Sequence, residues 1–450
     1  MRKKLSILAL TAVFGTGAYA ASIDHVQTYT PEYLGNQAQN GMINSSSVFY
    51  NPAGIMHLEN GTYIHLGAQL AVGKEEMDYN DKNYDADLLQ YIPTFALYSV
   101  RDNRAIFWTF GALGGGGDLE YKDGVAGTAV VPDILNSLGE KFSLPFTFYD
   151  DSSSAEGKSL YGQTTLGRAW MINDKLSMSI AGRAVLGLKK LKGNIDVGGG
   201  PKPIHADIDS DRTAWGIGAQ IGFNYKATDK LNLAMRYDSR IKLNFKASGY
   251  ENAADIDFGK GSMGEVHFSD FYPEFEPGTK TRRDLPAILA LGGSYQATDR
   301  WTIALSGNYY FNKDAKMDRK AGSVKLVSPA GPIEIKGLEA DYDNGWEIAL
   351  GTEYKLNNKW ILLGSINYAD TGAKVSSYDD VEYALNSITL GTGLKYKPTE
   401  YDEWVFTVSH FFYDSEKGHY NEKYANYPKV KNPEYDKSIT AFGVAYTKKF

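Results

Sequence analysis

The sequence predicts an all-β transmembrane barrel of fourteen antiparallel strands, with a small N-terminal hatch plugging the lumen. Three observations lead to this prediction: apolar and polar residues alternate along most of the chain, short polar turns recur between aromatic residues, and the N-terminus resembles an export signal. Successive side chains of a strand point to opposite faces, so long alternating runs give one apolar and one wet face. Closing such strands into a barrel leaves no unpaired edge in hydrocarbon.

The first twenty residues have the pattern of a secretory signal peptide. Positions 2–4 are basic, positions 5–14 are mostly apolar, and positions 18–20 read Ala-Tyr-Ala, a small-residue cleavage site. An apolar run of this length is too short for a membrane anchor, which needs about 20 residues. We therefore expect residues 1–20 to be removed on export.

From residue 61 to the C-terminus, apolar residues recur with a period of two. In residues 215–225 every odd position is apolar or aromatic, and every even position is Gly, Gln or Asn. The polar face suits a wet interior. The predicted organisation is therefore a signal peptide at 1–20, a hatch at 21–60 and a barrel at 61–450.

Six short polar turns divide the barrel into hairpins. They are rich in Asn and Asp, which tolerate the positive φ of tight turns, and most follow a Tyr and precede a Leu or Trp. These aromatic residues then lie at one height, as in the girdle of an outer-membrane barrel. The turns occupy residues 101–103, 173–175, 228–230, 298–300, 357–359 and 399–403. Six turns join twelve strands, and one strand at each end gives fourteen.

The opposite rim is expected to carry long, uneven loops. They are predicted at residues 75–90, 118–158, 193–211, 249–281, 315–336, 372–382 and 415–435. Short turns on one rim and long loops on the other are typical of outer-membrane barrels, and the chain ends in an aromatic residue, Phe450. A secreted soluble β protein would explain the alternation but not these turns. We expect a multi-pass β-barrel of the bacterial outer membrane, inserted by the barrel-assembly machinery and surrounded by outer-membrane lipid and lipopolysaccharide.

Residues 21–60 do not alternate and precede the first strand. A fourteen-stranded barrel is too wide for its own side chains to fill, so its lumen is either open or plugged. A flexible periplasmic tail is the alternative to a plug, but apolar residues such as Met42, Val48 and Phe49 disfavour a solvated tail.

Residues 45–54, Ser-Ser-Ser-Val-Phe-Tyr-Asn-Pro-Ala-Gly, resemble the N-terminal hatch of the FadL-type family of outer-membrane transporters for long-chain fatty acids and other hydrophobic compounds. The resemblance extends over 214–246, 346–368 and the segment from 285 onward. It implies passive uptake of a hydrophobic ligand by a monomer, with a hatch that rearranges and a third strand kinked inward to open the wall laterally. The implied site residues are the hatch motif Asn51, Pro52 and Ala53 and the strand-3 glycines Gly114, Gly115, Gly116 and Gly117.

Asn51 is inferred to hydrogen-bond the hatch to the wall. Glycine inside a strand marks a bulge or bend, although these four could also form a flexible entry to the loop at 118–158. The family's third outer loop is long and apolar, whereas residues 193–211 are short and polar. We therefore predict that the second and fourth outer loops capture the ligand, although these loops could equally pack only against each other. The candidate capture residues are Phe142, Phe146, Phe148, Phe268, Phe271, Tyr272 and Phe275.

Composition argues against chemistry of the protein's own. The chain has no Cys and a net charge of −7, which exclude thiolate sites and disfavour nucleic-acid binding. The seven His lack metal-ligand spacing, and no G-x-S-x-G motif is present. We expect neither cofactor nor metal nor enzyme activity, with a barrel hydrolase as the enzymatic rival. A nonspecific porin, or a surface adhesin acting through the long loops, would also fit this pattern, and the sequence does not separate fatty acids from aromatic hydrocarbons.

Overall fold

The computed structural model describes residues 26–141, 143, 145–200, 203–248, 275–317, 323–324, 333–334, 342–378, 380–424 and 427–450. The predicted signal peptide at 1–20 lies outside the described residues. Within the described part of the chain, none of the helices has the length and apolar character needed to cross a bilayer.

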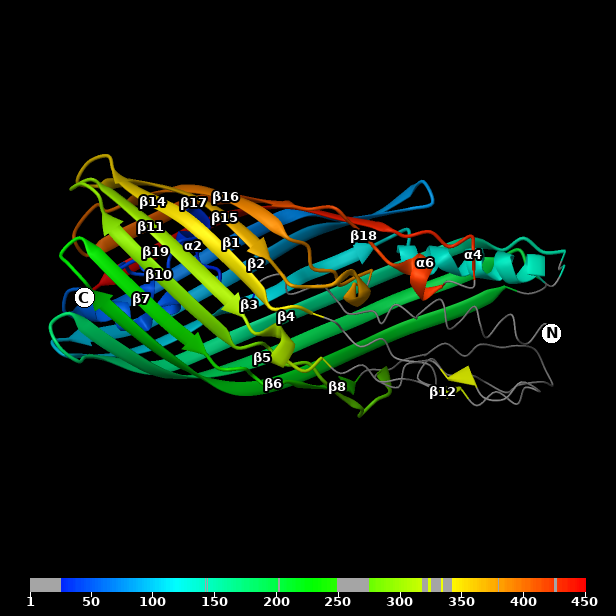
Figure 1. Ribbon diagram of the computed structural model, residues 1–450, viewed down its shortest axis with the longest axis horizontal. Helices are drawn as coiled ribbons and strands as arrows, with labels where there is room; N and C mark the ends of the chain where they lie inside the picture. Colours follow the sequence, from blue (N-terminus) through cyan, green and yellow to red (C-terminus); the bar gives the residue numbers. More distant parts are fainter. Residues whose placement is uncertain are drawn as a thin grey trace.

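The protein forms a closed barrel of 14 antiparallel strands, which confirms the predicted fold class (Figure 1). Each strand pairs with the next along the chain, and the pairing of β1 with β19 closes the cylinder. Two strands are each divided into two pieces. The barrel strands are β1 (Gly61–Tyr79), β2 (Lys82–Arg101), β3 (Arg104–Tyr121), β4 (Tyr149–Met171), β5 (Leu176–Gly198), β6 (Ile204–Lys226), β7 (Leu231–Asp238) with β8 (Asn244–Ser248), β9 (Lys280–Arg282) with β10 (Ile288–Gln296), β11 (Trp301–Tyr310), β14 (Gly345–Lys355), β15 (Trp360–Asp370), β16 (Ser387–Tyr396), β17 (Asp402–Tyr413) and β19 (Glu434–Lys449).

The strand alternation places apolar side chains on the outside of the barrel. Leu166, Trp215 and Ile217 are each more than 60% exposed, which would be unfavourable in water and is expected of a wall that faces hydrocarbon. The aromatic residues beside the short turns are also exposed at one rim, as in an interfacial girdle. They are Tyr225, Tyr295, Trp301, Tyr354 and Trp404.

The remaining elements gather at the rim opposite the C-terminus, where α4, α6 and β18 lie close together (Figure 1). These are α4 (Ala126–Lys141), η3 (Asn312–Asp314), β12 (Ser323–Val324), β13 (Ile333–Glu334), η4 (Val375–Ser377), β18 (Glu416–Lys417) and α6 (Tyr420–Lys423). The helix α4 lies within the predicted loop at 118–158, and the sequence analysis did not identify it.

Two of the predicted long loops are wrong. In place of the loop at 75–90, β1 and β2 continue to a two-residue turn, Asn80-Asp81, in which both residues have positive φ. In place of the loop at 193–211, β5 and β6 continue to Gly198 and from Ile204. Beyond the membrane the outward face no longer needs apolar residues, so the alternation ends while the hydrogen-bonded ladder continues.

The segment ahead of β1 folds into three short helices inside the barrel (Figure 1). They are α2 (Pro31–Gly35), α3 (Ser47–Tyr50) and η1 (Pro52–His57), and nearly all of their residues are buried. The helix α2 packs against β16, β17 and β19, while η1 packs against β4, β5 and β6 on the other side of the lumen. We call residues 26–60 the hatch segment.

Candidate functional site

The first turn of the hatch segment is built by local capping. Thr30 precedes α2 and its Oγ1 accepts a hydrogen bond from the backbone N–H of Tyr33 at 3.3 Å. Pro31, the first helical residue, has no N–H to leave unpaired. The Tyr50 hydroxyl donates to the carbonyl of Thr28 at 2.8 Å, and burial raises the pKa of Tyr50. The phenol therefore stays a neutral hydrogen-bond donor.

The predicted motif Asn51, Pro52 and Ala53 lies where α3 meets η1, buried against β5 and β6. Asn51 Nδ2 donates to Oδ1 of Asn224 on β6 at 2.9 Å, and Ser177 Oγ on β5 donates to the carbonyl of Ala53 at 2.7 Å. The structure thus places the motif in contact with the wall, and its role in transport stays a prediction.

A buried charged cluster also holds the hatch segment, and sequence reasoning missed it. Arg236 on β7 donates through Nη1 to the carbonyl of Phe49 at 3.1 Å and to that of Tyr50. Its Nε lies 3.3 Å from a carboxylate oxygen of Asp238, and Arg183 Nη1 lies 3.8 Å from the same oxygen. Burying a guanidinium without such partners would cost several kcal/mol of folding free energy, about as much as breaking a buried ion pair. The Arg236 side chain therefore keeps these partners, and its bonds to the carbonyls of Phe49 and Tyr50 fix the position of α3.

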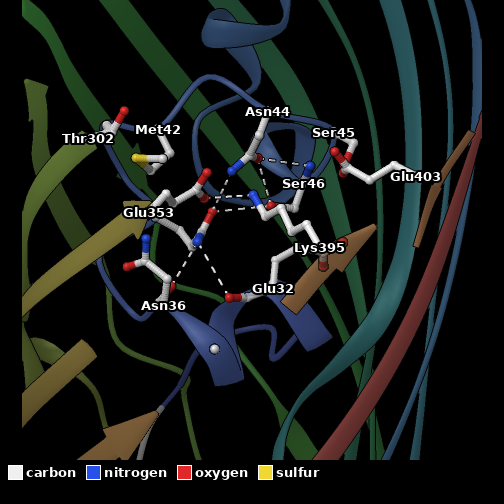
Figure 2. A network of polar contacts seen from close by, with 12 residues as sticks. Glu32, Asn36, Met42, Asn44, Ser45, Ser46, Thr302, Glu353, Lys395 and Glu403 are labelled. Carbon is white, nitrogen blue, oxygen red and sulfur yellow. Dashed lines mark hydrogen bonds and ion pairs between the residues drawn. The ribbon is translucent and has the colours of Figure 1, made fainter. Parts of the chain in front are cut away.

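Residues 39–46 of the hatch segment form hydrogen bonds with one another and with the barrel wall (Figure 2). Asn44 Nδ2 and Ser46 Oγ both donate to Gln39 Oε1, at 3.1 and 3.2 Å. Ser45 Oγ donates to Glu403 of β17 at 2.7 Å. A cavity of 610 Å³ adjoins this network and is lined by hatch residues such as Ser45, by strand ends and by residues of the short turns.

The barrel wall is interrupted between β2 and β3. Their ladder runs from the pair Arg101–Arg104 to the pair Phe95–Phe110 and stops there. Residues 82–94 of β2 and 111–121 of β3 are all described and are not joined by a ladder. Over these ranges β2 pairs with β1 and β3 pairs with β4, so each strand keeps only one neighbour.

The four predicted glycines lie beside this interruption. Gly114, Gly115 and Gly117 have φ values of +149°, +133° and +77°, and the register of β3 on β4 shifts at Gly114 and again before Gly117. A Cβ on Gly115 would lie 2.3 Å from the carbonyl oxygen of Ser159, so only glycine fits there. These residues form a β-bulge that bends β3. Whether a ligand passes at this point stays a prediction.

An apolar cavity of 90 Å³ connects the hatch segment with the bulge. Its lining includes Leu34 of α2, Leu88 of β2 and Phe411 of β17, together with Gly114 and Gly115. Leu34, Leu88 and Phe411 are all buried. We call this cavity the wall pocket, because it lies behind the gap between β2 and β3.

One charged residue borders the wall pocket and is neutralised. Glu75 of β1 lies in the lining, and its carboxylate is 3.2 Å from Nζ of Lys437 on β19. The rest of the lining is mostly apolar, so the pocket suits the hydrocarbon part of a ligand. Phe411 and Tyr413 could have been found from the sequence, since they are aromatic residues at inward-facing positions of β17.

The described capture candidates differ in exposure. Phe148 and Phe275 are buried, and Phe275 packs 4.8 Å from the guanidinium of Arg212, whereas Phe146 is partly exposed. The other four, Phe142, Phe268, Phe271 and Tyr272, lie outside the described residues. Their capture role stays a prediction.

The outer loops are joined above the lumen by a buried carboxylate. Asp380 accepts hydrogen bonds from the hydroxyls of Tyr420 and Tyr435, at 2.6 and 2.9 Å, and from the backbone N–H of Gly127 at the start of α4. Three separate loops therefore form one cap. No local pattern in the sequence marks this contact, because Asp380 is one of several acidic residues in segment 379–382 and its partners lie 40 or more positions away.

The model of the family described as outer membrane protein transport protein (OMPP1/FadL/TodX) matches residues 18–450. This family consists of transport channels rather than enzymes. Outer membrane protein P1 of Haemophilus influenzae is 23% identical over 164 residues, which are 36% of this chain. The match spans 31% of that protein's length.

Solved structures with a similar fold cover almost the whole chain. A FadL homologue of Pseudomonas aeruginosa has a TM-score of 0.65 at 15% identity and covers 96% of this chain and 100% of its own. The toluene transporter TodX of P. putida gives 0.62 at 15% identity, covering 94% and 99%. The toluene transporter TbuX of Ralstonia pickettii gives 0.61 at 17% identity, also covering 94% and 99%. At these identities the likeness concerns the fold alone.

Proposed function

Because the chain belongs to the FadL/TodX family of outer-membrane transport proteins, we propose that it takes up hydrophobic small molecules passively, long-chain fatty acids first among them. The observation that supports this most is the wall pocket, an apolar cavity that reaches from the hatch segment to the gap between β2 and β3. A ligand held there can enter the membrane sideways. This route avoids exposing an alkyl chain to water, which costs about 0.8 kcal/mol per CH₂ group.

The proposed path begins at the outer loops and ends at the wall. The capture residues of the second and fourth outer loops deliver the ligand to the lumen. The hatch at 21–60 blocks its passage to the periplasm, and a rearrangement of the hatch around Asn51 opens the wall pocket. The hydrogen bonds of Asn51 with Asn224 of β6 and of Arg236 with the carbonyl of Phe49 support this order, because they hold the hatch segment against the wall. A monomer inserted by the barrel-assembly machinery is part of the proposal.

A second cavity supports fatty acids as ligands. It measures 70 Å³, and its lining includes Lys189, Arg283 and Tyr161 together with the carboxylates of Glu382 and Asp284. Lys189 lies 3.0 Å from Glu382. Lys189 and Arg283 bring two cationic side chains to this one cavity, and together they can bind the carboxylate of a fatty acid.

Uptake by a blocked variant tests the proposal. Ala71 lines the wall pocket, whereas Ala68 on the same strand points to the lipid and is exposed. We expect Ala71→Phe to fill the pocket and lower uptake of labelled oleate at least about tenfold, while Ala68→Phe leaves uptake within about twofold of wild type. Heat-modifiable electrophoretic mobility measures the folded fraction of each variant.

Equal uptake by both folded variants would contradict the route. Absence of uptake by the wild type, for oleate and for toluene alike, would contradict the function. Steady ion conductance with the hatch in place would instead indicate a porin.

A further inference from the structure

The outer face of the barrel carries a groove between β6 and the chain segment that joins β7 to β8. β6 pairs with β7 from Gln220 to Lys226 and with β8 from Asp211 to Thr213, so the described residues 214–219 have no ladder on this side. The groove has a volume of 810 Å³. Gly216 allows the close approach of the two backbones, since a Cβ there would lie 2.4 Å from the carbonyl oxygen of Lys242.

The groove lies at the outer boundary of the membrane. Trp215 in the groove and Tyr225 in the turn-side girdle both lie on β6, and the strand rises about 3.3 Å per residue. With a tilt of about 40°, Trp215 lies roughly 25 Å above Tyr225. This equals the height of the apolar band of an outer-membrane barrel, about 25 Å. Trp215 and Ile217, 74% and 70% exposed, therefore face the outermost part of the hydrocarbon.

Three lysines at this boundary have no carboxylate partner among the described residues. Lys242, Lys246 and Lys280 line the groove and are exposed, and no described residue makes an ion pair or a hydrogen bond with their ammonium groups. Lys246 and Lys280 are direct partners in the ladder between β8 and β9. Like charges directly opposite each other destabilise a sheet, so this pair gains from an anion between them.

Three other outward lysines on the same half of the barrel have carboxylate partners. Lys74 lies 2.8 Å from Asp85, Lys158 lies 2.9 Å from Asp118, and Lys190 lies 3.1 Å from Glu156. These three cations are paired across neighbouring strands, whereas the described residues give the groove lysines no such partner.

We propose that this groove binds one lipopolysaccharide molecule of the outer leaflet. Lys242, Lys246 and Lys280 bind the phosphates of its lipid A, and Trp215 and Ile217 pack against its acyl chains. Ammonium groups form strong charge-assisted hydrogen bonds with phosphate oxygens, and anionic headgroups attract cations at the membrane surface. An apolar floor below a cationic rim matches a phosphorylated glycolipid, whose phosphates lie directly above its acyl chains. The site is separate from the wall pocket and independent of transport.

Native mass spectrometry of detergent-purified protein, titrated with purified lipopolysaccharide, tests this site. The variant Lys242→Gln/Lys246→Gln/Lys280→Gln is compared with the control Lys74→Gln/Lys158→Gln/Lys190→Gln, which removes three paired lysines at the surface. We expect the groove variant to bind lipopolysaccharide at least roughly tenfold more weakly, and the control to stay within about twofold of wild type. Dephosphorylated lipopolysaccharide should bind wild type as weakly as the intact glycolipid binds the groove variant.

Several results would overturn the proposal. They are unchanged binding by the folded groove variant, an equal loss in the control, or equal binding of phosphatidylglycerol by wild type. Heat-modifiable mobility reports folding. If the triple variant does not fold, Lys246→Gln alone relieves the like-charge pair with Lys280 and should weaken binding about threefold, and unchanged binding by it contradicts the site.

Discussion

The bulge in β3 makes a sharp prediction for the variant Gly115→Ala. Gly115 has a φ of +133°, which an L-residue rarely adopts, and its missing side chain makes room for the carbonyl of Ser159 on β4. An alanine at this position therefore cannot keep the bulge. We expect the residue to move toward a regular strand conformation, which restores the ladder to β4 and narrows the gap beside β2.

The size of the effect follows from two costs. A non-glycine residue in such a region costs about 1–3 kcal/mol, and overpacking against a backbone atom that cannot rotate away costs about 1–3 kcal/mol more. Their sum, roughly 2–6 kcal/mol, reduces the population of the bulged form at least about thirtyfold, since 1.4 kcal/mol is a factor of ten. Uptake through the gap should fall at least about tenfold.

Two matched glycines separate the bulge from glycine loss in general. Gly117 also has positive φ, +77°, but a Cβ there would meet only the flexible Gln90 side chain at 3.5 Å. Gly117→Ala should therefore cost only about 1–2 kcal/mol and lower uptake less. Gly162 on β4 faces open space, so Gly162→Ala should leave uptake and stability unchanged.

The measurement is the initial rate of labelled oleate uptake per folded barrel in the outer membrane, with folding followed by heat-modifiable mobility. Wild-type uptake by folded Gly115→Ala would refute the proposed exit at the bulge. An equal fall in all three variants would show that the method reports barrel damage and not the gap.

Two further predictions concern the hatch segment. Asn51→Ala removes one hydrogen bond worth about 1 kcal/mol, while Asn224 Oδ1 keeps its hydrogen bond from Asn232. Uptake should therefore fall with barrel assembly intact. Normal uptake would contradict the inferred role of Asn51. Burial, with Lys226 nearby, lowers the pKa of His57 to about 4, so the folded protein keeps His57 neutral where the unfolded chain is protonated below about pH 6.5. Stability should therefore decrease as the pH falls from about 6.5 toward 4, and thermal unfolding of His57→Gln should lose this part of the pH dependence.

The strands were predictable because the membrane imposes a simple rule on them. Hydrocarbon requires apolar residues at alternate positions, and the short turns require Asn or Asp, so both leave a direct record in the sequence. The rule ends at the membrane surface, and there the prediction failed. Lys74 and Asp85 form an ion pair across the extended β1–β2 hairpin, but in sequence they resemble a polar loop.

The interior was less predictable, since its contacts join residues distant in the chain. Arg236 holds Phe49 and Tyr50 from 186 or more positions away, and nothing in the local pattern of β7 marks it. The wall pocket likewise takes two or three residues from each of several strands. The glycines of β3 could be predicted, because a run of four has a local meaning, but the cavity they border could not.

The interruption between β2 and β3 has an energetic cost that argues for a function. The ladder begins at Arg104 and ends at Phe110, so at about 3.3 Å per residue and a tilt of about 40° the gap opens roughly 15 Å above the turn-side rim. That depth is near the middle of the membrane, where water is absent and each unpaired backbone group costs several kcal/mol. Continuing the ladder would remove this cost. A barrel that keeps the gap, with a glycine bulge to form it and an apolar pocket behind it, gains something in return, and a ligand leaving here would enter hydrocarbon without crossing the headgroups.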